Sequence, residues 1–138
     1  TRGVTLCGIM KNVYAVGLGM AAGCNFGDNI KACIATRAIQ EMETLVGSTV
    51  TSYAGIGDFL TTCYSSKSRN YTYGFEWARN HNVDSIMAEG VKNIDKLIDY
   101  SPVDLPVVKT VKQCFESGNT SALNTLLDHP QHILEDHL

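Results

Sequence analysis

The sequence has few charged residues and shows no basic face. Charged side chains make up 18% of the 138 residues, below the roughly 25% of an ordinary soluble domain. The net charge is −3, which argues against a nucleic-acid-binding protein. Two interpretations of the low charge stay open. Part of the surface contacts another domain or subunit, or the chain is a small helical fold that buries most of its side chains.

Long apolar runs and paired cysteine motifs are also missing. A membrane span needs about 18 consecutive apolar residues, and the small-residue stretch near the start is interrupted by Lys11 and Asn12. We therefore expect no membrane span, and no signal peptide is evident. The five cysteines form no CxxC pair, which indicates reduced thiols, mostly core fillers, in a cytoplasmic protein. The chain begins with Thr1 rather than Met, which is consistent with a fragment or a processed piece.

The hydrophobic pattern predicts an all-α domain of six to eight helices, because no strand alternation, repeat or linker is present. Five glycines occur within residues 3–23, in and beside the first expected helix, where each glycine costs roughly 1 kcal/mol relative to alanine. Such a helix is expected to pack closely, deep in the domain or against another one. The expected helices cover 4–22, 28–46 (capped by Asp28 and closed by Gly47), 68–79, 88–100, 106–117 (begun by Pro106 and stopped by Gly118) and a short last segment ended by Pro130.

Lys11 and Asp58 are the first candidates for chemistry. Lys11 lies in the middle of an apolar helix, where restricted access to water lowers the pKa of an amine and makes it a usable proton donor or acceptor. The alternative is a lysine whose long stem reaches the surface. Asp58 follows Gly57 at a turn. It either pairs with a buried lysine or, as the sequence alone favours, caps the short segment "FLTTCY".

Arg69 is a candidate anion ligand. It follows Ser68, a good N-cap residue, and so lies in the first turn of a predicted helix, where the helix dipole disfavours a cation. A bound phosphate would remove this conflict, and Ser68 and Asn70 would add donors. The alternative is an exposed arginine beside an ordinary cap. Glu89, before Gly90, is most simply a first-turn acid, and the C-terminal histidines match no metal motif.

Four blocks of the sequence resemble one family. "LCGIMKNVYAVGLGMAAG" is similar to the "GGALKNVIAIAAGI" stretch that opens the C-terminal domain of NAD(P)-dependent glycerol-3-phosphate dehydrogenases. "GDNIKACIATRAIQEM" resembles the family's "GDNTKAALITRGLAEM", and "YAGIGDFLTTCYSSKSRNYTYG" resembles "GLGDLVVTCTSxxSRNxxFG". "MAEGVKN" resembles "VVEGVxT". The blocks occur in the family's order and cover most of residues 4–98.

The resemblance implies a helical domain of the 6-phosphogluconate dehydrogenase C-terminal-like type. It further implies an oxidoreductase that interconverts sn-glycerol 3-phosphate and dihydroxyacetone phosphate with NAD or NADP and supplies glycerol 3-phosphate for glycerophospholipid synthesis. Lys11 falls on the family's proton acceptor. The substrate-site positions are Lys11, Asp58, Thr62, Ser68, Arg69 and Asn70, and the cofactor contacts are Arg69, Met87 and Glu89. A homodimer is the expected assembly.

Two departures from the family pattern limit these expectations. No GxGxxG motif follows a strand, so the dinucleotide-binding half is missing from residues 1–138, and we expect the isolated domain to be inactive. Residues 71–88 are also fewer than in the family, which weakens the assignment of Met87 more than that of Glu89. The alternative function is a standalone helical module that binds a phosphate ligand or dimerises, without redox activity.

Overall fold

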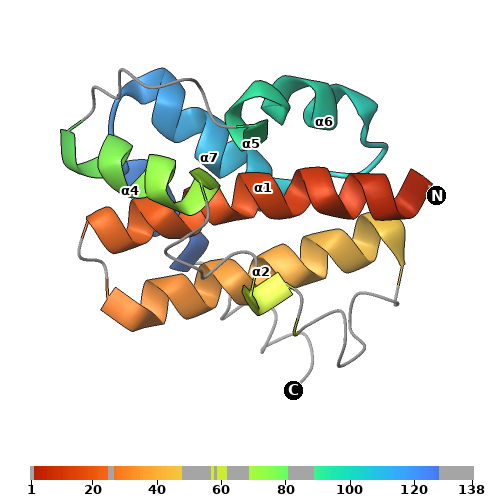
Figure 1. Ribbon diagram of the computed structural model, residues 1–138, viewed down its shortest axis with the longest axis horizontal. Helices are drawn as coiled ribbons and strands as arrows, with labels where there is room; N and C mark the ends of the chain where they lie inside the picture. Colours follow the sequence, from red (N-terminus) through yellow and green to blue (C-terminus); the bar gives the residue numbers. More distant parts are fainter. Residues whose placement is uncertain are drawn as a thin grey trace.

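The computed structural model describes residues 2–24, 27–47, 57, 59–61, 69–80 and 89–127. Within these ranges all regular structure is helical and no strand occurs, which confirms the all-α prediction. The helices are α1 (Arg2–Gly23), α2 (Gly27–Val46), α4 (Arg69–Asn80), α5 (Glu89–Lys92), α6 (Ile94–Tyr100), α7 (Pro106–Ser117) and the 3₁₀-helix η2 (Ser121–Leu127). Figure 1 shows α1 through the middle of the domain, with α2 along one side and α4 to α7 along the other.

Helix α1 is the centre of the core. Every residue from Val13 to Met20 is buried, as expected for a helix that is apolar on all sides. By length and composition alone the window Leu6–Gly23 could cross a membrane, with a mean hydropathy of 1.2, in spite of Lys11 and Asn12. However, 56% of that window is buried inside the domain, which is the behaviour of a core helix.

Glycines hold α1 and α4 in backbone contact. A methyl group at Gly74 of α4 would lie 2.0 Å from the carbonyl oxygen of Val16, and one at Gly19 of α1 would lie 2.0 Å from that of Tyr71. Neither space can hold a side chain of any size. The close packing predicted from the glycine-rich first helix therefore takes place against α4.

The local start and stop signals are mostly confirmed. Gly47 and Gly118, with φ of 102° and 78°, end α2 and α7 in the left-handed conformation that favours glycine. Pro106 begins α7, as predicted. Asp28 is not the cap, because α2 begins one residue earlier at Gly27.

Two expected elements differ from the prediction. The region 88–100 is not one helix, because a turn at Asn93 separates α5 from α6, although Ile94 and Leu97 are buried as expected. The last element, Ser121–Leu127, is a 3₁₀-helix rather than an α-helix. Short terminal helices commonly adopt this tighter form. Pro130 lies outside the described residues.

A carboxyl group from α2 caps the start of α7. The N–H of Val107 donates to Oε1 of Glu41 at 2.9 Å, which supplies an acceptor that the N-cap residue Leu105 lacks. Glu41 is only 6% exposed. Burial raises the pKa of its carboxyl to about 8, against the lowering by hydrogen bonds from the Val107 and Val108 backbone.

We expect the stability of the domain to fall between pH 5 and pH 8 because of Glu41. Its pKa is raised from 4.5 to about 8, so the folded state holds the proton more tightly than the unfolded state across this window. Stability is therefore lost as the pH rises, by on the order of a few kcal/mol in total. Glu41→Gln should remove this loss in denaturant unfolding curves at pH 6 and pH 9. Glu43→Gln, an exposed neighbour on α2, is the control and should retain it.

Candidate functional site

Lys11 lies on α1 between the buried core and the surface. Its side chain is half-buried, and so is that of Asn12, whereas Met10 and Val13 are fully buried. Helix α5 also packs against α1. An amine in this position has an apolar surround and partial access to solvent, which suits a group that exchanges a proton with a ligand.

The first turn of α4 carries Arg69 and Asn70. Arg69 is the first residue of this helix, as the sequence predicted, and its side chain is exposed, while Asn70 is half-buried. Figure 1 shows that this end of α4 lies over the middle of α1, and that the two helices then run in the same direction. Arg69 and Lys11 therefore belong to two helices that pack against each other.

A lysine that the sequence reasoning did not consider also reaches this helix start. Nζ of Lys31, on α2, donates to the hydroxyl oxygen of Tyr71 at 3.2 Å and lies 5.7 Å from the centre of the tyrosine ring. Tyr71 follows Asn70 and is buried. The sequence did contain a signal, because Lys31 belongs to the "GDNIK" block, but only the fold brings it to α4.

The neighbour of Asp58 is anchored on α1. Phe59 is fully buried, and its ring centre lies 6.1 Å from that of Tyr14. Tyr14 lies about one helical turn beyond Lys11 on α1. The chain next to Asp58 is thus held close to the lysine-bearing turn. Asp58 itself, with Thr62, Ser68 and Met87, lies outside the described residues.

The start of α5 is the remaining predicted position. Glu89 is the first residue of this helix, and its side chain is not described. Helices α4 and α5 both pack against α1, the central helix that carries Lys11. The structure thus brings together the elements that carry Lys11, Arg69, Asn70 and Glu89.

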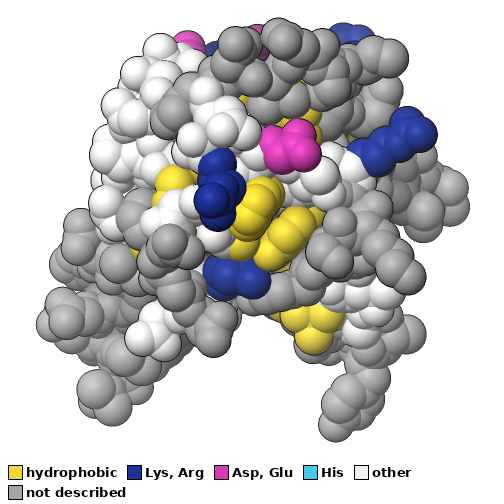
Figure 2. All heavy atoms as spheres, turned by 60° about the vertical axis from the view of Figure 1, so that its left-hand side comes forward, with side chains coloured by type: hydrophobic (Ala, Val, Ile, Leu, Met, Phe, Trp, Pro, Cys, Tyr) yellow, Lys and Arg dark blue, Asp and Glu magenta, His cyan; other side chains and the backbone are white. Residues whose placement is uncertain are grey.

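The molecular surface in this region mixes charge and apolar groups. Figure 2 shows Lys and Arg side chains on either side of a group of exposed hydrophobic side chains, with one acidic side chain at its edge. Such a face offers positive charge to an anion and apolar area to a second surface.

Comparison with known proteins identifies the family. Residues 1–123 match the family model described as NAD-dependent glycerol-3-phosphate dehydrogenase C-terminus. The chain belongs to this family. The resemblance read from the four sequence blocks is thereby confirmed.

Individual relatives support the assignment of the chain to this glycerol-3-phosphate dehydrogenase C-terminal family. The glycerol-3-phosphate dehydrogenase (NAD(P)+) of Prosthecochloris aestuarii is 36% identical over 124 residues, covering 79% of this chain and 37% of the relative. That of Pseudomonas putida is 34% identical over 142 residues, covering 92% of this chain and 41% of the relative. The crystal structure of glycerol-3-phosphate dehydrogenase from Coxiella burnetii matches with a TM-score of 0.75 and 29% identity, over 91% of this chain and 44% of that chain. The chain thus spans about two fifths of the length of these relatives.

Proposed function

We propose that this chain is the substrate-binding and catalytic domain of an NAD(P)-dependent glycerol-3-phosphate dehydrogenase. The complete polypeptide would interconvert sn-glycerol 3-phosphate and dihydroxyacetone phosphate, and supply glycerol 3-phosphate for glycerophospholipid synthesis. The observation that carries the proposal is the packing of α4 along α1. Arg69 begins α4 and Lys11 is half-buried on α1, so both proposed site residues belong to one closely packed pair of helices.

Lys11 would move the proton. As the secondary alcohol of glycerol 3-phosphate is oxidised, its amine takes the hydroxyl proton, and in the reverse direction it returns a proton to the carbonyl oxygen. Its half-buried position keeps the amine close to apolar groups and still open to a ligand. Asp58, next to the anchored Phe59, would orient the lysine, and Thr62 belongs to the same motif.

Arg69 would hold the substrate phosphate. An exposed guanidinium has two parallel N–H groups to offer to a phosphate, and the start of a helix favours a bound anion. Ser68 and Asn70 would add donors. The phosphate is remote from the reacting carbon, so its binding energy positions the hydroxyl against Lys11.

The described residues contribute only a part of a cofactor site. They form no strand, and therefore no strand–turn–helix unit of the kind that holds a dinucleotide. NAD or NADP, when bound, accepts or supplies the hydride. This chain would meet it through Arg69, Met87 and Glu89, while a separate dinucleotide-binding domain holds most of it. That domain is the principal partner, and we further propose a homodimer in the cytoplasm.

Arg69→Ala in the complete polypeptide tests this proposal. We expect the KM for glycerol 3-phosphate to rise by at least about tenfold, because a charge-assisted hydrogen bond contributes about 1.5–3 kcal/mol. Steady-state kinetics with varied substrate give the value. Arg79→Ala is the matched control, because Arg79 is exposed in the last turn of the same helix. An unchanged KM in Arg69→Ala would refute the phosphate role.

A further inference from the structure

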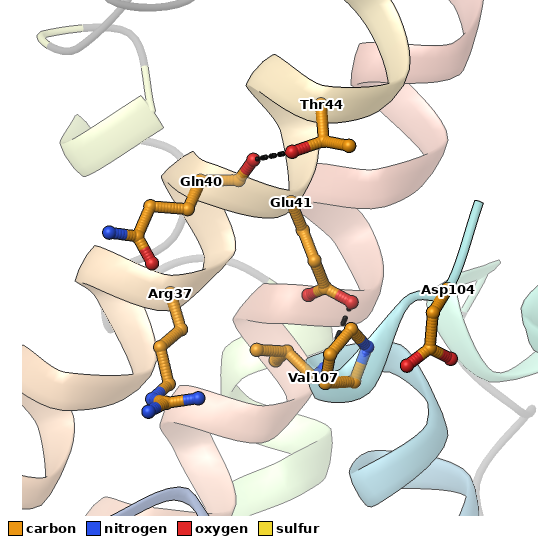
Figure 3. Close-up of a pocket in the computed structure, with 7 residues that line it drawn as sticks. Arg37, Gln40, Glu41, Thr44, Asp104 and Val107 are labelled. Carbon is orange, nitrogen blue, oxygen red and sulfur yellow. Dashed lines mark hydrogen bonds between the residues drawn. The ribbon is translucent and has the colours of Figure 1, made fainter. Parts of the chain in front are cut away.

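A pocket lies between α2 and the start of α7. It has a volume of about 280 Å³ and is lined by Arg37, Gln40, Glu41 and Thr44 of α2, together with Asp104 and the first residues of α7. Figure 3 shows the Glu41 side chain reaching the start of α7, and the Arg37 side chain extending from the neighbouring turn of α2 to one side of Val107, with no hydrogen bond drawn between the two. Nothing in the proposed reaction uses these groups.

Arg37 offers an unused pair of donors. Its Nε and Nη2 atoms are buried, and neither has a hydrogen-bond partner among the described residues. These two nitrogens form one edge of the guanidinium, with parallel N–H bonds that match two oxygens of a carboxylate or phosphate. A buried donor without a partner costs free energy, so this edge is poised for an acceptor.

Glu41 offers a third group. Its side chain is only 6% exposed, and its Oε1 accepts the N–H of Val107, whereas Oε2 is buried without a partner at hydrogen-bonding geometry. Burial raises the carboxyl pKa to about 8, and the Tyr14 hydroxyl, close enough to interact with the carboxyl, counters part of that rise. Near neutral pH the carboxyl is therefore mainly protonated. Because Oε1 is an acceptor, Oε2 carries the proton and is a donor.

Two of the polar side chains around the pocket already have partners. The Asp104 carboxylate receives Nζ of Lys109 at 2.6 Å, which balances its charge. The Thr44 hydroxyl donates to the backbone oxygen of Gln40. The buried groups that lack a partner here are thus donors, and they lie at the N-terminal end of a 12-residue helix, where the dipole favours negative charge.

We propose that this pocket binds a small oxyanion, a carboxylate or a phosphate, on the Nε/Nη2 edge of Arg37 and the Oε2 hydroxyl of Glu41. The site is distinct from the phosphate position proposed at Arg69. The surrounding charged and titratable groups are Arg37 on α2, Tyr14 on α1, Asp104 before α7 and Lys109 on α7. The Glu41 carboxyl itself, with a pKa of about 8, loses its proton just above neutral pH. Anion binding therefore weakens as the pH rises above that value.

Side-chain NMR of the complete polypeptide tests the site directly. Inorganic phosphate and acetate are titrated separately at constant ionic strength, following the Nε–Hε signal of each arginine. The Arg69→Gln background removes phosphate binding at the other site. We expect the Arg37 signal, identified by its loss in Arg37→Lys, to shift to saturation with at least one of the two anions. The anion that saturates identifies the ligand class. A non-saturating shift equal to that of exposed Arg79, with both anions, would overturn the proposal.

The pH dependence supplies a second, independent test. In the wild-type chain the affinity for acetate should fall up to about tenfold between pH 7 and pH 9, as Glu41 loses the donor proton and gains a charge. In Glu41→Gln the affinity for acetate, which is ionised at both pH values, should be the same at pH 7 and pH 9, because the amide keeps a donor and stays neutral. This comparison does not need the arginine variant to fold. An equal fall in wild type and Glu41→Gln would exclude Glu41 from the site.

Discussion

Lys11→Ala in the complete polypeptide is expected to lower kcat for glycerol 3-phosphate oxidation by about 10²–10⁴-fold, the usual contribution of a positioned general base. The half-buried lysine lies on the central helix, against which α4 packs. Because Arg69 would still hold the phosphate, KM should change much less than kcat. Steady-state kinetics in both reaction directions give these values, and both directions should be impaired because one group moves the proton each way.

Two controls separate chemistry from folding. Lys96→Ala removes an exposed lysine on α6 and should leave turnover unchanged. A small primary amine added to Lys11→Ala should restore part of the lost activity, since it supplies the missing base in solution. Normal turnover in Lys11→Ala would exclude the catalytic role and favour a binding or dimerisation module.

Gly74→Ala is expected to destabilise the domain by about 3 kcal/mol or more, at the upper end of what overpacking costs. The added methyl group would meet the Val16 carbonyl oxygen at 2.0 Å and the Met20 nitrogen at 3.0 Å. Both are backbone atoms of α1, so they cannot move aside as the end of a side chain can. The helices must separate, and the buried surface between them is lost. Urea unfolding of wild type and variant gives the difference.

Gly8→Ala is the matched control for this helix pair. Gly8 lies on α1, but a methyl group there would have no atom within 4 Å. Alanine should therefore stabilise the helix by up to about 1 kcal/mol through its propensity. A Gly74→Ala variant as stable as the wild type would contradict the backbone contact. Gly19→Ala should reproduce the loss, because its methyl group would lie 2.0 Å from the Tyr71 carbonyl oxygen.

The predictions that came true rest on local chemistry. Pro106, Gly47 and Gly118 mark helix boundaries because each restricts or frees its own backbone angles, whatever lies around it. The turn at Asn93 was missed, because the apolar spacing of residues 88–100 continues across it. The 3₁₀ form of η2 was missed for a similar reason, since three- and four-residue spacings look alike over seven residues.

The long-range pairs had no local signal. Glu41 and Val107 are 66 positions apart, and Lys31 and Tyr71 are 40 apart. Glu41 reads as one more polar residue of an amphipathic helix until α7 is placed against it. Lys11 and Arg69 were selected from the sequence because each conflicts with its local surroundings, one an amine in an apolar helix and the other a cation at a helix start. Their roles remain predictions.

The glycine contacts between α1 and α4 have a consequence for substrate length. Side chains packed in a core can adjust by changing rotamers. Two backbones in direct contact have no rotamers and cannot adjust in this way. The distance between the two helices is therefore fixed. The distance from the turn of α1 that carries Lys11 to the first turn of α4 is fixed with it. Under the proposed function, a homologue of glycerol 3-phosphate with one extra methylene before its phosphate could satisfy one end of the site only. The fixed distance between the helices would select substrates by length, without any side chain that contacts the carbons between the hydroxyl and the phosphate.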